Sequence, residues 1–161
     1  MADMNKTSLS LANDPKGAAG PTFRMKVSPA TDPIRLSAYS ADVGMPVSAD
    51  PDVDGEVILA RANSEAGARW LGLAATAGEN PGYINVQTGG PLSLPTALWD
   101  LRTGQSGGLT PNAIYYVSAA TPGQLTTTPP GGGGDYLAPV GFAISPTTML
   151  IVLSLAEPAN P

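Results

Sequence analysis

Hydrophobic residues occur along this chain in short runs that glycine, proline and other turn-forming residues interrupt. After Asp14, no stretch without glycine or proline exceeds 11 residues, the longest being Glu56–Ala66 and Thr147–Glu157. Helices of ordinary length, about 11–12 residues, therefore have almost no room. Short apolar runs bounded by turn residues are typical of strands, so the pattern predicts an all-β fold.

The apolar runs place strands along most of the chain after residue 21. Glu79-Asn80-Pro81-Gly82 and Thr121-Pro122-Gly123 carry the proline and glycine that type II turns need, so we expect hairpin turns there. Strand order depends on long-range pairing, and the pattern leaves a compact β-sandwich, an open barrel and a β-tulip as alternatives. We expect strands near Thr22–Ser28, Ile34–Tyr39, Glu56–Ala62, Arg69–Ala75, Tyr83–Gln87, Leu98–Leu101, Ile114–Ser118, Gln124–Thr128, Tyr136–Ile144 and Thr148–Leu155.

The first part of the chain differs from the rest. Residues 1–21 lack a strong apolar period and end in the run Lys16-Gly17-Ala18-Ala19-Gly20-Pro21. We therefore expect residues 1–21 to form a flexible, extended N-terminal arm that orders on a partner. Residues 22–161 then form one β-rich domain, with a core module at residues 55–155.

The composition excludes several classes of function. The chain has no histidine and no cysteine, which removes the commonest general base, thiolate nucleophiles, disulfides and zinc–thiolate sites. Charged residues make up 13% and the net charge is −5, with no basic cluster for nucleic acid. The chain contains no run of about 18 apolar residues, so the sequence predicts no membrane span. We expect neither enzymatic activity nor a cofactor, and no nucleic-acid or membrane partner.

Two motifs suggest chemistry that their context does not support. Asp50-Pro51-Asp52-Val53-Asp54-Gly55 matches the start of a calcium-binding EF-hand loop, but position 12 is Arg61 instead of glutamate. The sequence favours a solvated acidic loop over a calcium site. Gly104-Gln105-Ser106-Gly107-Gly108 matches the nucleophile elbow of hydrolases, but without histidine Ser106 has no usual base, and a glycine-rich loop is favoured.

Aromatic residues lie within or beside the predicted strands, where aromatics usually fill cores. The aromatic residues are also candidates for stacking against a sugar or a base, namely Trp70, Trp99, Tyr39, Tyr83, Tyr115, Tyr116 and Tyr136. Tyr115 and Tyr116 are adjacent, so they point to opposite faces of a strand, and we expect one of them to meet solvent or a neighbouring subunit.

The second half of the chain resembles a known module. The motifs occur in a fixed order within Leu98–Ile151, and Glu56–Gln87 extends the resemblance toward the N-terminus. The motifs are Ala97-Leu98-Trp99-Asp100, Gly107-Gly108-Leu109-Thr110-Pro111, Tyr115-Tyr116-Val117-Ser118, Pro122-Gly123-Gln124-Leu125-Thr126-Thr127-Thr128-Pro129, Pro139-Val140-Gly141-Phe142-Ala143-Ile144-Ser145 and Thr148-Met149-Leu150-Ile151. This order resembles a β-rich module of tailed-bacteriophage virion surface proteins, found in head decoration (cement) proteins and in fibre proteins. The resemblance implies a trimer without catalytic residues.

The resemblance and composition together predict a structural protein. We expect a phage capsid decoration protein that binds the major capsid protein on the outer surface of the mature head and stabilises it, as a homotrimer, with residues 1–21 as the docking element. The alternative is a tail or head fibre protein that attaches through its N-terminus and presents the module to host glycans through Trp70, Trp99 or Tyr116.

Interface residues are predicted from charge and aromatic character. Arg24, Lys26 and Arg35 are candidates for contact with an acidic capsid surface. Trp99 and Tyr116 are candidates for exposed aromatic anchors, because aromatic residues are enriched at interface centres.

Overall fold

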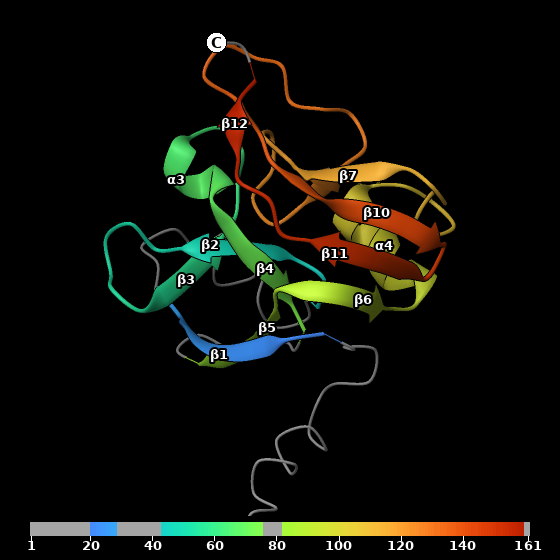
Figure 1. Cartoon of the computed structure of the whole chain (residues 1–161), viewed down its shortest axis with the longest axis horizontal. Coiled ribbons are helices and arrows are strands. Elements are labelled where there is room, and N and C mark those ends of the chain that lie inside the picture. The colour runs from blue at the N-terminus through green and yellow to red at the C-terminus, as the bar shows by residue number, and fades with distance from the viewer. Residues whose placement is uncertain (1–19, 29–42, 76–81, 160–161) are drawn as a thin grey trace, which may run out of the picture.

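The structure is a computed structural model that describes residues 20–28, 43–75 and 82–159. Strands make up most of its regular structure, which confirms the predicted all-β fold (Figure 1). The helices are α3 (Glu65–Ala68) and α4 (Thr96–Thr103). The strands are β1 (Thr22–Val27), β2 (Pro46–Ala49), β3 (Glu56–Leu59), β4 (Trp70–Ala74), β5 (Tyr83–Gln87), β6 (Gly89–Ser93), β7 (Ile114–Val117), β8 (Leu125–Thr126), β9 (Tyr136–Leu137), β10 (Pro139–Ser145), β11 (Thr148–Val152) and β12 (Glu157–Pro158).

Five strands close into a small barrel in the order β1-β3-β2-β4-β5. The antiparallel pairing of β5 with β1 completes the barrel, and the β1–β3 pair is parallel. Alternate residues along β5 point to opposite sides of the strand: Ile84 and Val86 are buried, whereas Tyr83 is exposed. Closure pairs both edges of every barrel strand, so among the described residues the barrel offers no free strand edge.

A second, open sheet of five strands lies beside the barrel, in the order β6-β11-β10-β7-β8. Its inner face packs against α4, which lies behind β10 and β11 in the view of Figure 1. Trp99 of α4 is fully buried there in one cluster with Tyr115, Ala143, Met149 and Ile151. The core therefore covers one face of this sheet.

The edges of the open sheet are poor templates for further strands. At one edge, Pro91 has no backbone N–H to donate. The fully buried Gln87 side chain donates its Nε2 to the carbonyl oxygens of Gly89 and Pro91, both at 3.0 Å. At the other edge, β8 is two residues long. Short strands and proline at an edge disfavour edge-to-edge association, which leaves the faces of this sheet for contacts.

Several predicted strands match the structure closely. β5 has the predicted bounds, and β1, β4 and β7 agree within one residue at each end. The predicted strand Tyr136–Ile144 is divided into β9 and β10. The turn at Thr121-Pro122-Gly123 is confirmed, because Gly123 has a φ of 72° and the Gln124 N–H donates to the Thr121 carbonyl. The predicted strand Ile34–Tyr39 and the arm up to residue 19 lie outside the described residues.

The predicted strand Leu98–Leu101 is wrong, because these residues belong to α4. Pro95 lies at the N-terminal cap and Gly104 ends the helix in the left-handed conformation, with a φ of 67°. Both residues are typical of helix boundaries. The short strands β2, β6 and β12 were not predicted; β6 begins with the run Gly89-Gly90-Pro91, which is typical of a turn.

Gly141 allows β10 and β11 to approach closely, and its replacement is a test of the sheet. A β-carbon at Gly141 would lie 2.0 Å from the Leu150 carbonyl oxygen. We expect Gly141→Ala to lower the free energy of unfolding by about 1–3 kcal/mol, measured by urea denaturation. Gly133→Ala is the control, because a β-carbon there has no atom within 4 Å. Equal unfolding midpoints for the two variants would contradict this account of the sheet.

Among the described residues, neither α3 nor α4 combines the length and the apolar character that a helix needs to span a membrane.

Candidate functional site

The outer face of the open sheet is apolar and exposed. Ile114, Phe142 and Leu150 lie directly opposite one another on β7, β10 and β11. Directly opposed residues on neighbouring strands share a face, so the three side chains form one row. Ile144 and Val152 extend the row on β10 and β11. We call these five residues the apolar face; Ile114, Ile144 and Val152 are each at least half exposed, and Phe142 is 40% exposed.

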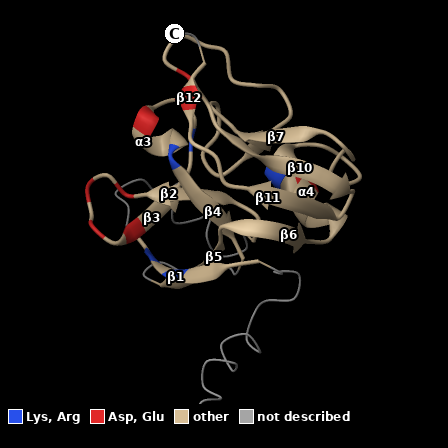
Figure 2. Cartoon of the chain, viewed as in Figure 1, with Lys and Arg blue, Asp and Glu red and all other residues tan. Residues whose placement is uncertain are grey.

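The apolar face carries no charge. The strands of the open sheet contain no Asp, Glu, Lys or Arg, and Asp135 is the one charged residue between Thr103 and Glu157. Charged residues instead lie on α3, α4, β1 and β12 and on the loop before β3, while the strands of the open sheet carry none (Figure 2). The surface of the described chain is therefore divided into a charged part and an uncharged part.

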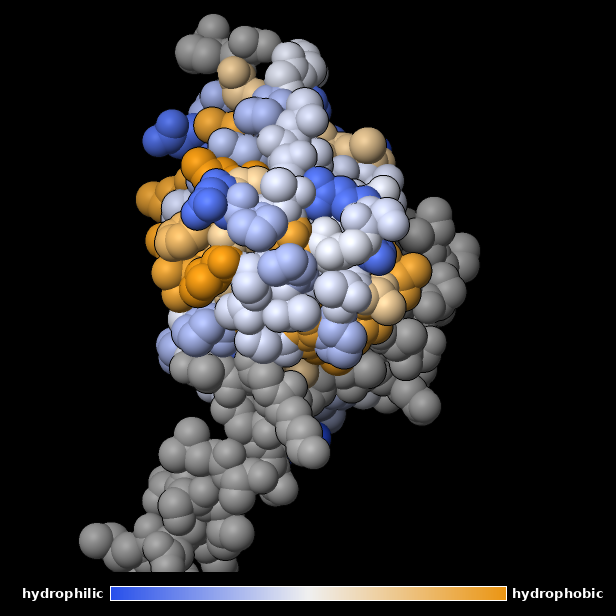
Figure 3. Space-filling view, turned by 90° about the vertical axis from the view of Figure 1, so that its right-hand side faces the viewer, coloured by the Kyte–Doolittle hydropathy of each residue, from blue (hydrophilic) through white to orange (hydrophobic). Residues whose placement is uncertain are grey.

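An apolar surface of this kind points to a contact with another macromolecule. Hydrophobic residues gather along the left margin of the space-filling view, which is the side that faces the viewer in Figure 1 (Figure 3). Single exposed hydrophobic residues are common, but contiguous apolar patches on a soluble chain mark interaction sites. Interface centres are likewise poor in charged residues.

The two adjacent tyrosines of β7 differ in burial, as expected for neighbours on a strand. Tyr115 is fully buried, and Tyr116 on the opposite side of the strand is half-buried. The Tyr115 hydroxyl donates to Gln105 Oε1 at 2.7 Å and accepts from the Thr110 N–H at 2.8 Å. Tyr115 is therefore a core residue, whereas Tyr116 lies on the same side of β7 as Ile114 and remains a candidate contact.

The prediction of Trp99 as an exposed anchor is wrong. Its side chain has no exposed surface, and its indole Nε1 donates to the Thr147 carbonyl oxygen at 3.0 Å. The physical reason is the helix: α4 buries Trp99 and Arg102, one turn apart, on the side that faces the sheet. Trp99 therefore fixes α4 to the core.

The described basic candidates on β1 contact residues of their own chain. Lys26 Nζ lies 2.5 Å from Glu56 Oε1, across the parallel pair of β1 and β3. The hydrogen bond to Glu56, together with the carboxylate charge, raises the pKa of Lys26. The Arg24 guanidinium lies 4.3 Å from the centre of the Tyr83 ring. Arg35 lies outside the described residues.

The acidic loop before β3 shows a turn geometry. Asp50 Oδ1 accepts from the Asp52 N–H at 2.8 Å, an Asx turn, and residues 51–55 are all exposed. In the described ranges, no three metal-ligating side chains come together. The structure therefore places the carboxylates in an exposed acidic loop.

The glycine-rich loop after α4 lacks the context of a nucleophile elbow. An elbow joins a strand to a following helix, whereas this loop follows a helix. The Asp100 carboxylate accepts from the backbone N–H groups of Gly107 and Gly108, at 3.2 and 2.6 Å. Ser106 is exposed in the middle of this loop. The loop is organised by Asp100, as expected for a structural connection.

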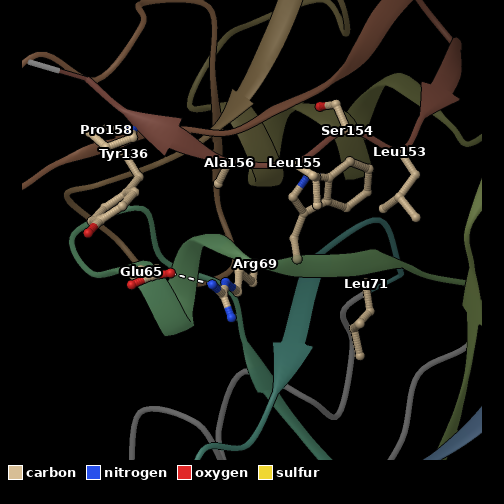
Figure 4. Close-up of a pocket in the computed structure, with 10 residues that line it drawn as sticks. Glu65, Arg69, Leu71, Tyr136, Leu153, Ser154, Leu155, Ala156 and Pro158 are labelled. Carbon is tan, nitrogen blue, oxygen red and sulfur yellow. Dashed lines mark hydrogen bonds and ion pairs between the residues drawn. The ribbon is translucent and has the colours of Figure 1, made fainter. Parts of the chain in front are cut away.

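A groove of about 650 Å³ lies between α3, β4, β9 and the segment that joins β11 to β12. Trp70 and Tyr136 line it, together with leucines from the joining segment (Figure 4). The exposed pair Glu65 and Arg69 lies at its border. No local sequence pattern predicts this groove, because its residues come from three separate parts of the chain.

Comparison with known proteins yields no match to any family model, curated protein or solved structure.

Proposed function

We propose that this chain is a structural protein without catalytic activity, a capsid decoration (cement) protein of a tailed bacteriophage. In this proposal it binds the major capsid protein on the outer surface of the mature head, as a homotrimer, and stabilises the head. The observation that carries the proposal is the apolar face, which is exposed, uncharged and contiguous across three strands. The resemblance of Glu56–Gln87 and Leu98–Ile151 to phage virion modules supplies the class of particle.

Such a protein stabilises the mature head by mass action, because it binds that state of the head and not the others. A protein that binds only the mature head stabilises each site by about 2.7 kcal/mol when its free concentration is 100 times the Kd. The same stabilisation at each of many equivalent sites adds up, and no catalysed reaction is needed. An uncharged apolar face suits this role, because its burial removes apolar surface from water and leaves no charged group without its hydration.

The alternative, a fibre protein that recognises host glycans, has less support from the exposure of its candidate aromatic side chains. A sugar stacks on the open face of an aromatic ring. Trp99 is fully buried and Trp70 is 3% exposed, so neither presents an open ring face. Among the three aromatic candidates, Tyr116 alone retains partial exposure.

The experiment that tests the proposal is to locate and count this chain on its native particle. Cryo-electron microscopy of purified virions gives the location, and quantitative mass spectrometry gives the copy number. We expect many copies at equivalent positions on the head surface. A few copies at the tail or at a single vertex would overturn the proposal and favour the fibre alternative.

A further inference from the structure

The hairpin loop between β2 and β3 contains a glycine directly after an aspartate. β2 ends at Ala49 and β3 begins at Glu56. Asp54-Gly55 is the one place in the sequence where glycine follows an aspartate or an asparagine. The loop is acidic and projects from the barrel (Figure 2). An aspartate side chain can react with the backbone of a following glycine, so the surroundings of this pair decide whether the reaction occurs.

The reaction is an attack of the Gly55 backbone nitrogen on the side-chain carboxyl carbon of Asp54. The new nitrogen–carbon bond closes a succinimide ring, and the amide proton leaves with the carboxyl hydroxyl as water. Water then adds to either carbonyl of the ring. Opening at the side-chain carbonyl restores aspartate, whereas opening at the backbone carbonyl leaves the chain linked through the side chain, as isoaspartate. The net change is an isomerisation that needs no oxidant, reductant or co-reactant besides water.

The attacking nitrogen of Gly55 is unencumbered. Among the described residues, the Gly55 N–H donates no hydrogen bond, whereas the next N–H, that of Glu56, donates to the Val53 carbonyl oxygen at 3.3 Å. Gly55 has a φ of 77°, and a β-carbon built on it would have no atom within 4 Å. The absence of a side chain at this position leaves room for the ring to form.

The carboxyl group of Asp54 is equally unrestrained. Residues 51–55 are all exposed, and Asp54 makes no hydrogen bond or ion pair with the described part of the chain. Its side chain can therefore turn toward the Gly55 nitrogen without losing a partner. The base of the hairpin is fixed, because the Asp50 N–H donates to the Glu56 carbonyl oxygen at 2.9 Å. The tip of the loop can thus change while the hairpin stays paired.

The other aspartates of the described chain each lack one of these conditions. Asp50 is followed by proline, which has no N–H, and Asp52 is followed by a β-branched valine, which crowds the nitrogen. The carboxylates of Asp100 and Asp135 accept hydrogen bonds from backbone N–H groups of glycines, at 2.6 and 2.9 Å. In the described ranges, Asp54 alone combines an unbonded carboxyl group with an uncrowded, unbonded nitrogen.

We propose that Asp54 is a site of spontaneous isomerisation to isoaspartate in the folded protein. The product keeps the mass and the negative charge, but it adds one carbon to the backbone of the loop and moves the carboxylate onto the α-carbon. The turn from Val53 to Glu56 then loses its present geometry, while the β2–β3 ladder beyond it can remain. This inference goes beyond the proposed function and does not depend on it.

Ageing of the full-length chain at neutral pH tests the proposal. Peptide mapping with electron-transfer fragmentation distinguishes isoaspartate from aspartate, and an isoaspartyl methyltransferase detects the product independently. We expect isoaspartate at position 54 to form in the folded chain within about tenfold of its rate in the urea-unfolded chain, a difference of at most about 1.4 kcal/mol in the barrier. Asp54→Glu is the matched control, because it keeps the charge and the glycine but would have to close a larger ring. Its peptide should stay unmodified.

The variant Asp54→Asn tests the geometry of the loop by a change of mass. The same attack on an amide releases ammonia in place of water, so ring opening leaves aspartate and isoaspartate where the amide was. Circular dichroism before ageing establishes that the variant is folded. We expect the folded variant to lose its amide. An amide that stays intact in the folded variant, while the unfolded variant loses it, would overturn the proposal. Isoaspartate elsewhere in the aged chain and none at position 54 would overturn it as well.

Discussion

Replacing Phe142 with aspartate is expected to abolish binding of this chain to expanded phage heads while the domain stays folded. Phe142 is the middle residue of the row on the apolar face, directly opposite Ile114 and Leu150. Its side chain is 40% exposed, so the free domain tolerates a charge there. In a complex that buries the face, the same carboxylate would lose its hydration without gaining a partner.

Co-sedimentation of the full chain with expanded heads measures this effect. Leu101→Asp is the matched control, because Leu101 is 60% exposed on α4, away from the apolar face. Thermal unfolding of both variants establishes that each is folded. We expect Leu101→Asp to bind as the unmodified chain does. Similar binding by the two aspartate variants would show that the apolar face is not the contact surface.

Replacing Trp99 with alanine is expected to lower the free energy of unfolding by about 3–5 kcal/mol, the usual range for a buried tryptophan. Trp99 has no exposed surface, packs in the cluster between α4 and the open sheet, and donates its indole N–H to Thr147. Its removal leaves a cavity and takes one of two hydrogen bonds from the Thr147 carbonyl oxygen, which still accepts from the Leu94 N–H. An interface anchor would instead reduce binding without changing stability.

Urea denaturation measures the loss, with Leu101→Ala as the control. Leu101 lies on the same helix and is exposed, so its truncation should change the free energy of unfolding by less than about 0.5 kcal/mol. Comparable unfolding midpoints for Trp99→Ala and Leu101→Ala would contradict the assignment of Trp99 to the core.

The candidate site was only partly predictable from sequence. The opposite burial of Tyr115 and Tyr116 follows from the two-residue period of a strand, and the structure confirms it. The apolar pattern of Leu98–Leu101 predicts a strand with an exposed Trp99, whereas the segment forms α4, which buries Trp99 in the core. The exposure of Phe142 was not predicted, because Val140 on the same strand is fully buried and both are apolar.

The all-β character, the positions of strands such as β1 and β5, and the scarcity of charge are all evident in the amino-acid sequence. These properties depend on local patterns of apolar and turn-forming residues, or on composition alone. The closure of the barrel, the exposed outer face of the open sheet and the groove beside Trp70 follow instead from how distant segments pack together. The parallel pairing of β1 with β3 and the burial of α4 join residues far apart in the chain. Local periodicity carries no information about such long-range contacts, which determine the faces that the core covers and those that remain exposed.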